Sequence, residues 1–311
     1  MASGPVADSI DSEAADFHVQ RPRIPICFTD SSRIFFILAA EITQALGCSK
    51  KRRSATMNVQ EKFAIASRVD DEMESLAESR WTMRQKLALA SRVLASEGHW
   101  RGLAGQITCR VDGGKQMLTL GFGVGYDEAC ASTLSLVDEN LVPIDGSRMP
   151  NPGVRFHAWL YNKRPDVHCI VHTHPPACAA LSMVGEPLAI AHMDATPLFD
   201  DCAFLAEWPG LPIGDDEGRI ISEAMGDKHA ILLANHGLLT AGTSIEEATL
   251  LAVWMEHSAE MHLRARAIGN IKPIEPELAR ESRDFLRKPK VLELTFAYFA
   301  RREIRRDGAL L

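Results

Sequence analysis

The chain has 311 residues, of which 46% are apolar and 24% are charged, and its formal net charge is −7. This is the composition of a globular protein, and it excludes a wholly disordered, collagen-like or coiled-coil chain. The acidic balance also excludes a strongly basic chain of the kind that binds nucleic acid through its net charge, so we expect no nucleic-acid partner.

The cysteines and the apolar runs indicate the compartment. Seven cysteines are scattered along the chain without a C-x-x-C pair, which is typical of free thiols in a reducing compartment. The longest apolar run, residues 34–40, is too short to span a bilayer. It also follows an acidic stretch, whereas a secretory signal opens the chain. We therefore expect a cytoplasmic protein with no membrane partner.

Three segments differ in character. Residues 1–56 combine acidic residues, prolines and a basic run at 50–53 without periodicity, so we expect a flexible or non-native extension; the alternative is a basic targeting tag. Residues 57–270 carry regular patterns and are expected to form the main domain. Residues 271–311 form a charged tail with isolated apolar residues, and we expect it to be helical and to pack on a neighbouring subunit.

The main domain is predicted to mix helices and strands. Apolar residues at helical spacing predict two helices within residues 58–97, the second ending near Gly98. Short runs bounded by Gly, Pro and Asp predict strands at 106–111, 117–122, 134–137 and 141–144. A helix at 156–162, a strand at 167–174, a helix at 218–225, a strand at 230–234 and a helix at 244–268 follow. Ser244 and Glu247 have the spacing of a capping box.

Histidines follow two of these predicted strands. His172 and His174 are two residues apart, so their imidazoles point to the same face of a strand that is followed by prolines. Another strand runs into His236, and Gly237 permits an abrupt turn there. Three imidazoles that leave a coordination position open would form a metal site of the catalytic type. The alternative is that His172 and His174 are simply polar residues on an exposed strand face.

Four motifs of the chain resemble the class II aldolase/adducin family. They are FHAWLY at 156–161, RPDV at 164–167, IVHTH at 170–174 and LLANHGLLT at 232–240. The resemblance covers about residues 80–268. It implies an α/β fold, a three-layer α/β/α sandwich around a mainly antiparallel central sheet. It also implies a divalent metal on His172, His174 and His236, for which we expect Zn2+, Mn2+ or Fe2+, and a homotetramer with active sites at subunit interfaces.

The chain departs from the sugar-phosphate aldolases of that family at several positions. Gly153 stands where those enzymes carry a glutamate that binds metal and acts as acid and base. The loops that hold phosphate are also altered: the first reads Gly-Gln-Ile-Thr and keeps Thr108 as a hydroxyl, and the second is a glycine-rich turn around Gly123. We therefore expect a substrate without phosphate, with His99, Thr108 and Gly123 as its binding residues.

Other residues are candidates for the missing acid. His192 and Asp194 are predicted to be strand neighbours that face the same pocket, and the guanidinium of Arg155 has the fork geometry that binds a carboxylate. We assign these three residues a catalytic role. The alternatives are a buried, hydrogen-bonded core residue for His192 and a surface residue for Arg155.

The altered pattern resembles a branch of the family that contains metal-dependent decarboxylases of aromatic acids and a non-haem iron oxygenase. We therefore predict a metal-dependent carbon–carbon lyase, of decarboxylase or aldolase type. Its expected substrate is a small non-phosphorylated hydroxy- or keto-carboxylic acid, aromatic acids included. Two alternatives stay open: a non-haem iron oxygenase on the same three histidines, and a non-catalytic adducin-like interaction module.

Overall fold

The computed structural model describes residues 65, 67–69, 71–72, 81–99, 102–111, 115–211 and 214–308. The chain divides into two units between Asn58 and Val59, and every described residue belongs to the second unit. The extension predicted at residues 1–56 and most of the first predicted helix lie outside the described residues.

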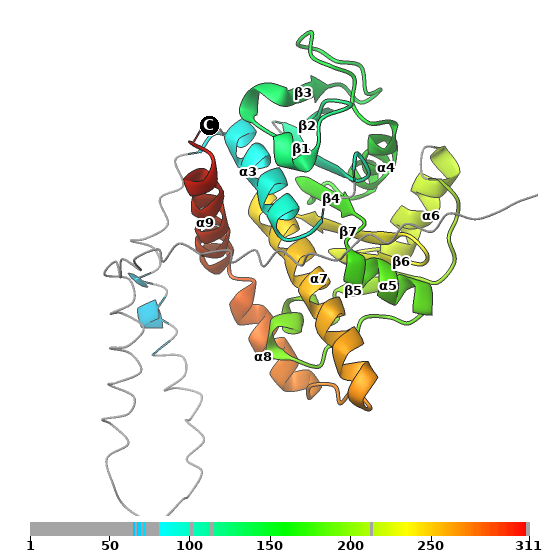
Figure 1. The fold of residues 1–311 in the computed structure, drawn as a ribbon, viewed down its shortest axis with the longest axis vertical. Helices are drawn as coiled ribbons and strands as arrows, with labels where there is room; N and C mark the ends of the chain where they lie inside the picture. The colour runs from blue at the N-terminus through cyan, green and yellow to red at the C-terminus, as the bar shows by residue number, and fades with distance from the viewer. Residues whose placement is uncertain are drawn as a thin grey trace, which may run out of the picture. The chain divides into compact units, whose positions relative to one another are not determined.

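Seven strands form one sheet in the order β3-β2-β1-β4-β7-β6-β5 in the part of the chain that the structure describes (Figure 1). They are β1 (Gln106–Val111), β2 (Gln116–Leu120), β3 (Leu134–Val137), β4 (Cys169–Thr173), β5 (Cys202–Leu205), β6 (Ala230–Leu233) and β7 (Gly237–Gly242). Five of the six pairings between these described strands are antiparallel, and β5 pairs parallel with β6. The sheet is therefore mixed, with β4 and β7 at its centre.

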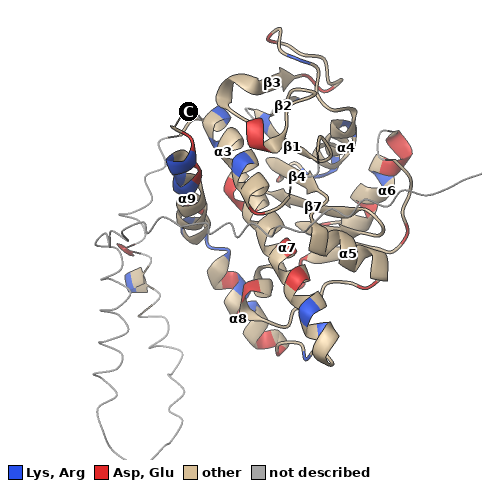
Figure 2. Ribbon diagram, in the orientation of Figure 1, with Lys and Arg blue, Asp and Glu red and all other residues tan. Residues whose placement is uncertain are grey.

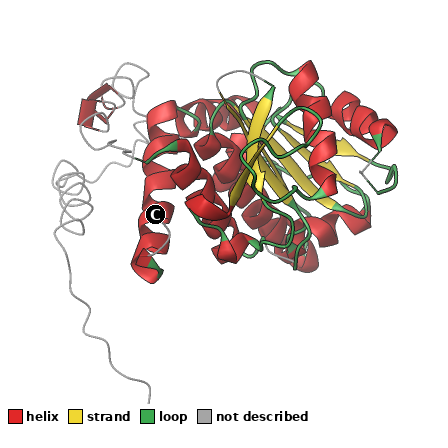
Figure 3. Ribbon diagram, turned by 90° about the horizontal axis from the view of Figure 1, so that it is seen from above, coloured by secondary structure: helices red, strands yellow, loops and turns green. Residues whose placement is uncertain are grey.

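Helices cover both faces of the sheet (Figure 3). On one face lie α4 (Arg155–Lys163) and α6 (Asp215–Met225), and on the other lie α3 (Met83–Ser96), α5 (Pro176–Val184), α7 (Ile245–Ile268) and α9 (Pro289–Arg306). Ile170 of β4 packs in an apolar cluster with Phe156 and Ile221, whereas its neighbour Val171 packs in a second cluster. Because successive strand residues point to opposite faces, the two clusters lie on opposite sides of the sheet. The described part of the chain is therefore a three-layer α/β/α sandwich.

The tail of the chain is helical and joins the core. It forms α8 (Pro276–Leu286) and α9, and Leu292, Phe296 and Ala300 of α9 are buried in the same apolar cluster as α3 and α7. A hydrogen bond of 2.7 Å from Ser96 Oγ to Glu303 Oε2 also joins the end of α3 to α9. The tail therefore packs on its own chain; packing on a neighbouring subunit stays a prediction.

Charge is distributed unevenly over these layers. Among the described residues, Lys, Arg, Asp and Glu lie on the helices and loops apart from Arg110 of β1, and β4 and β7 carry none of them (Figure 2). Two central strands without charged residues are typical of a sheet covered on both faces. None of the described helices combines the length and the apolar character that a membrane span requires.

The strand predicted at residues 141–144 is wrong. Leu141 adopts a left-handed backbone conformation, with φ 66°, and Pro143 has no N–H to donate to a ladder. The segment makes one isolated bridge, between Val137 and Pro143. It is a loop because neither residue fits an extended paired strand.

Strands β5 and β7 and helix α5 were not predicted from the sequence. Two glycines bound β7, and we interpreted Gly237 only as a turn residue. Helix α5 begins at Pro176, where proline at the first helical position costs no hydrogen bond. Gly237 at the start of β7 and Pro176 at the start of α5 are of residue types that can either end or begin an element. The sequence alone therefore does not identify these two starts.

The predicted capping box at the start of α7 is half present. Ser244 Oγ accepts a hydrogen bond of 3.1 Å from the backbone N–H of Glu247, as expected. The Glu247 carboxylate, however, accepts from the backbone N–H of Thr243 at 2.8 Å. The Glu247 carboxylate therefore binds the N–H of Thr243 instead of the N–H of Ser244, which a capping box would require.

Candidate metal centre

The pairing of β4 with β7 brings three histidines together. In this antiparallel ladder Thr173 of β4 lies opposite Leu238 of β7, so the end of β4 lies beside the start of β7. His172 is the last residue but one of β4, His174 directly follows β4 and His236 directly precedes β7. Two segments far apart in the sequence thus deliver their imidazoles to one edge of the central sheet.

A tight turn between β6 and β7 places His236. The backbone N–H of His236 donates to the carbonyl of Leu233 at 3.1 Å. Asn235, in the middle of the turn, has φ 56°, a left-handed conformation that asparagine tolerates better than most residues. The turn is short enough to hold His236 at the edge of the sheet.

Gly237 permits the close approach of the two histidine-bearing segments. A Cβ atom at this position would lie 2.4 Å from the carbonyl oxygen of Thr173 and 3.0 Å from Cδ2 of His174. Contacts this short are not tolerated, and the nearest atom is backbone that cannot move aside without disturbing the ladder. A larger residue would therefore push β7 and His236 away from His174.

Helix α5 holds the chain after His174. The backbone N–H groups of Ala177 and Cys178, in its first turn, donate to the two carboxylate oxygens of Glu256 on α7, each at 2.8 Å. Glu256 is buried. A carboxylate is well placed there because the N–H groups of a first helical turn have no partner within the helix. The path of the chain just after His174 is thereby fixed from α7.

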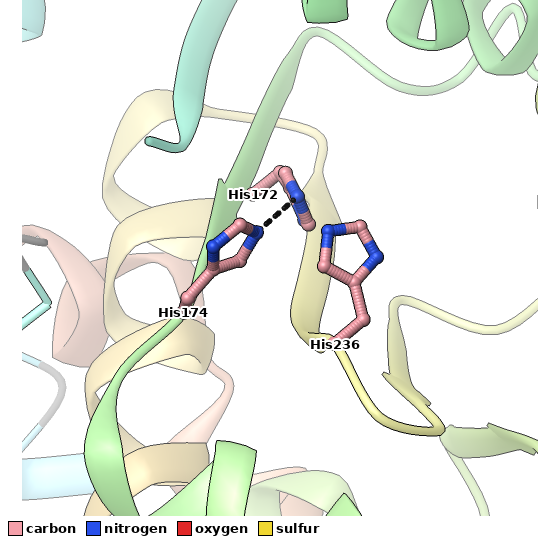
Figure 4. A group of neighbouring side chains, drawn as sticks. All are labelled: His172, His174 and His236. Carbon is pink, nitrogen blue, oxygen red and sulfur yellow. Dashed lines mark hydrogen bonds between the residues drawn. The ribbon is translucent and has the colours of Figure 1, made fainter. Parts of the chain in front are cut away.

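The three imidazoles converge. Figure 4 shows the rings of His172, His174 and His236 turned toward one another. One nitrogen of each lies within 4.8 Å of the others, and the Nε2 atoms of His172 and His174 are 3.0 Å apart. Three nitrogens at this spacing are suited to binding a common ion.

The hydrogen bonding of His172 directs its free nitrogen to the centre of the group. Its Nδ1–H donates to the carbonyl oxygen of Leu238 at 2.8 Å. Because a carbonyl only accepts, Nδ1 carries the proton and Nε2 presents a lone pair. This is the second hydrogen bond that histidine ligands of metals usually make.

The three imidazoles are neutral at pH 7. Burial lowers the pKa of His172 well below its usual value, and His236, His174 and His157 nearby lower it further. Burial likewise lowers the pKa of His174, and burial followed by the proximity of His174 lowers that of His236 to about 4. Neutral imidazoles offer lone pairs to a cation without first losing protons. The donor set therefore fits a divalent ion such as Zn2+ or Fe2+.

Helix α4 contacts this group through Phe156 and is joined to β1 through His157 and Thr108. Phe156 of α4 packs edge-on against His172, with 5.0 Å between ring centroids. His157 is fully buried, its Nδ1 lies 2.9 Å from Thr108 Oγ1, and burial lowers its pKa to about 3. Thr108 Oγ1 is also 2.9 Å from the hydroxyl of Tyr161. The hydroxyl of Thr108, predicted to bind substrate, is thus buried and bonded to α4.

The structure does not bring His99 to the imidazoles. His99 is fully buried, and its Nδ1 lies 2.9 Å from the hydroxyl of Thr173. Thr173 stands between His172 and His174 in the sequence and therefore points to the opposite face of the sheet. His99 packs behind the strand, and its predicted contact with substrate is not supported.

Arg155 already has a carboxylate partner within the protein. Its Nε donates to Asp215 Oδ1 at 2.8 Å, and Trp159 Nε1 donates to the same oxygen at 3.1 Å. Both residues of the Arg155–Asp215 pair are exposed, and the pair joins α4 to α6. The arginine predicted to bind a substrate carboxylate thus pairs with Asp215 at the surface.

His192 and Asp194 are not strand neighbours, so this prediction is wrong. His192 is the N-terminal cap of a 3-10 helix, η4 (Met193–Leu198), and Asp194 is exposed. Helix η4 packs against α7 and α8. Among the described residues, the histidine group at the end of β4 contains neither of them.

Gly123 and Gln106 line a hollow on the same half of the sheet. The hollow is small, about 20 Å3, and also borders Leu103 and Asn151. The predicted binding role of Gly123 is untested by this placement. Gln106 belongs to the altered loop at 105–108 and is not one of the predicted site residues. The feature that marks Gln106 is its position opposite His172 on the adjacent strand. This position follows only from the register of β1 against β4.

Comparisons with known proteins agree on the fold. Residues 85–263 match the family model described as Class II Aldolase and Adducin N-terminal domain. A solved structure titled L-fuculose 1-phosphate aldolase from Glaciozyma antarctica PI12 superposes with a TM-score of 0.68. It is 27% identical to this chain, and the match covers 76% of this chain and 97% of that one.

Two relatives come from Streptomyces. The 4-hydroxy-3-prenylphenylpyruvate oxygenase/4-hydroxy-3-prenylbenzoate synthase of Streptomyces roseochromogenus subsp. oscitans is 33% identical over 44% of this chain and 50% of its own length. Decarboxylase NovR of Streptomyces niveus is 32% identical over 44% of this chain and 51% of its own length. The chain thus spans about half the length of each of these two relatives.

Proposed function

The chain belongs to the class II aldolase and adducin N-terminal domain family, and we propose that it is a metal-dependent carbon–carbon lyase of decarboxylase or aldolase type. The proposed substrate is a small, non-phosphorylated hydroxy- or keto-carboxylic acid, aromatic acids included. The observation that carries the proposal is the convergence of three neutral imidazoles, His172, His174 and His236, at one edge of the central sheet.

These three histidines would hold the ion, which we propose to be Zn2+, Mn2+ or Fe2+. A divalent ion held by neutral ligands keeps its full double charge and stabilises the negative charge that develops as a carbon–carbon bond breaks. The protein orients the ligands: the Leu238 carbonyl fixes the ring of His172, and the ring of Phe156 covers one side of it. Gly153 contributes no carboxylate, which favours chemistry that does not depend on a glutamate base there.

Two features support an acid without phosphate. Apart from the hydroxyl of Thr108, the glycine-rich turn at 121–125 and the loop at 105–108 lack the residues with which sugar-phosphate enzymes of the family hold phosphate. One Streptomyces relative is named for a phenylpyruvate, which is an aromatic keto acid, and the other is named a decarboxylase. Family membership supports the further proposal of a homotetramer in the cytoplasm, with active sites at its subunit interfaces.

The proposal is tested by metal analysis and turnover with a panel of hydroxy- and keto-acids. We expect about one divalent ion per chain in the purified protein, and at least a hundredfold loss of metal affinity in His174→Ala, because one of three ligands is removed. His168→Ala is the matched control, since His168 lies near the other end of β4 and is exposed. A His174→Ala variant with full metal content and full turnover would refute the assignment.

A second candidate is a non-haem iron oxygenase. Its support is the relative named as an oxygenase, together with a nitrogen donor set that also suits Fe2+. Oxygen consumption during turnover decides between the two: stoichiometric uptake of O2 favours the oxygenase, and undiminished turnover under strict anaerobiosis excludes it.

A further inference from the structure

Gln106 lies on the same face of the sheet as the metal-binding histidines. It opens β1, and its Cα is paired with that of His172 on the adjacent strand β4. Directly opposite residues of an antiparallel pair point to the same face and have neighbouring side chains. The side chains of Gln106 and His172 therefore leave facing positions of two adjacent strands on the same face of the sheet.

The space in front of Gly153 is filled by this carboxamide. A Cβ atom at Gly153 would lie 2.6 Å from Gln106 Nε2, 2.9 Å from its Cδ and 3.1 Å from its Oε1. Gly153 itself is buried. Position 153 thus has no room for a side chain while Gln106 keeps this conformation, so the two residues form a complementary pair.

The carboxamide also has an unused acceptor. Gln106 is only 9% exposed, and its Oε1 is buried without a hydrogen-bond partner among the residues that the structure describes. Burying an amide oxygen without a partner is costly, so such groups usually mark a site that a ligand or water satisfies. Gln106 also borders the small hollow beside Gly123, whose volume of about 20 Å3 leaves room for a single polar group or water next to the carboxamide.

We propose that Gln106 is a substrate-binding residue whose Oε1 accepts a hydrogen bond from the hydroxyl of a hydroxy acid bound at the histidine site. The inference rests on the proposed function and narrows it. An acceptor in this position favours a substrate with a hydroxyl donor over the corresponding keto acid, whose oxygen can only accept. Gly153 is required because a side chain there would displace the carboxamide.

The test compares two acids with the same carbon skeleton. Mandelate and phenylglyoxylate, which differ in a hydroxyl against a keto oxygen, are titrated by calorimetry into the metal-loaded protein. We expect the wild type to bind mandelate about tenfold more tightly, and Gln106→Met to lose this preference while its metal affinity is unchanged. Gln116→Met is the matched control, because Gln116 also opens a strand of this sheet but is exposed.

A second variant displaces the carboxamide without removing it. Gly153→Ala places a methyl group against Gln106, and we expect the same tenfold loss of mandelate affinity. In a Gln106→Ala background the space is free, so Gly153→Ala should then change the affinity less than twofold. This dependence on the partner residue is not expected if Gly153→Ala merely loosens the fold.

The outcomes separate this inference from the proposed function. A wild type that binds metal but shows no preference for mandelate, or a Gln106→Met variant that keeps the preference, overturns the role of Gln106 and leaves the metal site intact. A wild type that binds no divalent ion overturns the proposed function and this inference together.

Discussion

His172 with His174, and His192 with Asp194, are both pairs of residues with one residue between them, but only the first pair lies on one face along a strand and its direct continuation. Strand β4 is paired on both sides, with β1 and with β7, so its backbone is held extended and its side chains alternate. His192 precedes the 3-10 helix η4, which contains Pro197. The same spacing therefore has different consequences in the two regions.

The difference shows when spacing of two residues is informative. Alternation requires a ladder, and a ladder requires partner strands that come from elsewhere in the sequence. The apolar run before His172 favours burial between two strands, whereas the segment around His192 includes polar residues and a proline that cannot donate to a ladder. Substitutions in the two regions should therefore differ in their effect on metal binding.

The largest effect is expected from Gly237→Ala, which attacks the approach of β7 to β4. The new Cβ would meet the backbone of Thr173, and overpacking of this kind costs about 1–3 kcal/mol of unfolding free energy. We also expect metal affinity to fall about a hundredfold, because His236 is pushed away from His174. Chemical denaturation and metal titration measure the two effects.

Gly269→Ala is the control for this substitution. A Cβ at Gly269, just beyond α7, meets no atom within 4 Å, so stability and metal affinity should stay near wild type. If Gly237→Ala binds metal as tightly as Gly269→Ala does, the close approach at Gly237 is not what positions His236.

A smaller effect is expected from Glu256→Ala, which frees the chain just after His174. The variant removes the acceptor of two N–H groups at the start of α5, and we expect a loss of about 2 kcal/mol, since hydrogen bonds to a charged group are among the stronger ones. Metal affinity should fall about tenfold, as is typical when a group that orients a ligand is lost.

The matched control is Glu260→Ala, one turn further along α7, where the carboxylate is exposed and pairs with Arg264. Such surface pairs contribute little, so the change in stability should be under about 1 kcal/mol. Equal metal affinities in Glu256→Ala and Glu260→Ala would show that α5 does not position His174.

The smallest effect is expected in the second region. His192→Ala and Asp194→Asn should each change metal affinity less than about twofold, because neither residue belongs to the imidazole group and distant sites act independently. Titration of the same ion under the same conditions gives the comparison. A tenfold loss in either variant would mean that η4 reaches the metal site and that the two regions are not separate.

The sequence was informative where a pattern is local. Most elements between α3 and α7 follow from apolar spacing, and the meeting of His172, His174 and His236 follows from two apolar strands that run into histidines. The family of the chain was also identified from motifs around these residues. The roles predicted for Arg155 and His99 assumed an environment that the sequence does not show, and they stay predictions: Arg155 pairs with Asp215, and His99 lies on the far side of β4 from the imidazoles.

Gln106 illustrates what spacing cannot supply. Its importance depends on being opposite His172 and in front of Gly153, and both contacts join segments that are distant in the chain. The register of β1 against β4 is set by the whole sheet, so no window of sequence around Gln106 reveals it.

The packing of α9 has a practical consequence for choosing fragments of this protein. The match to the family ends at residue 263, but Leu292, Phe296 and Ala300 complete the interior beneath α3 and α7. A recombinant fragment trimmed to the matched region would leave that interior open to water and prone to aggregation. Fragments for expression should therefore extend through Arg306, the end of α9.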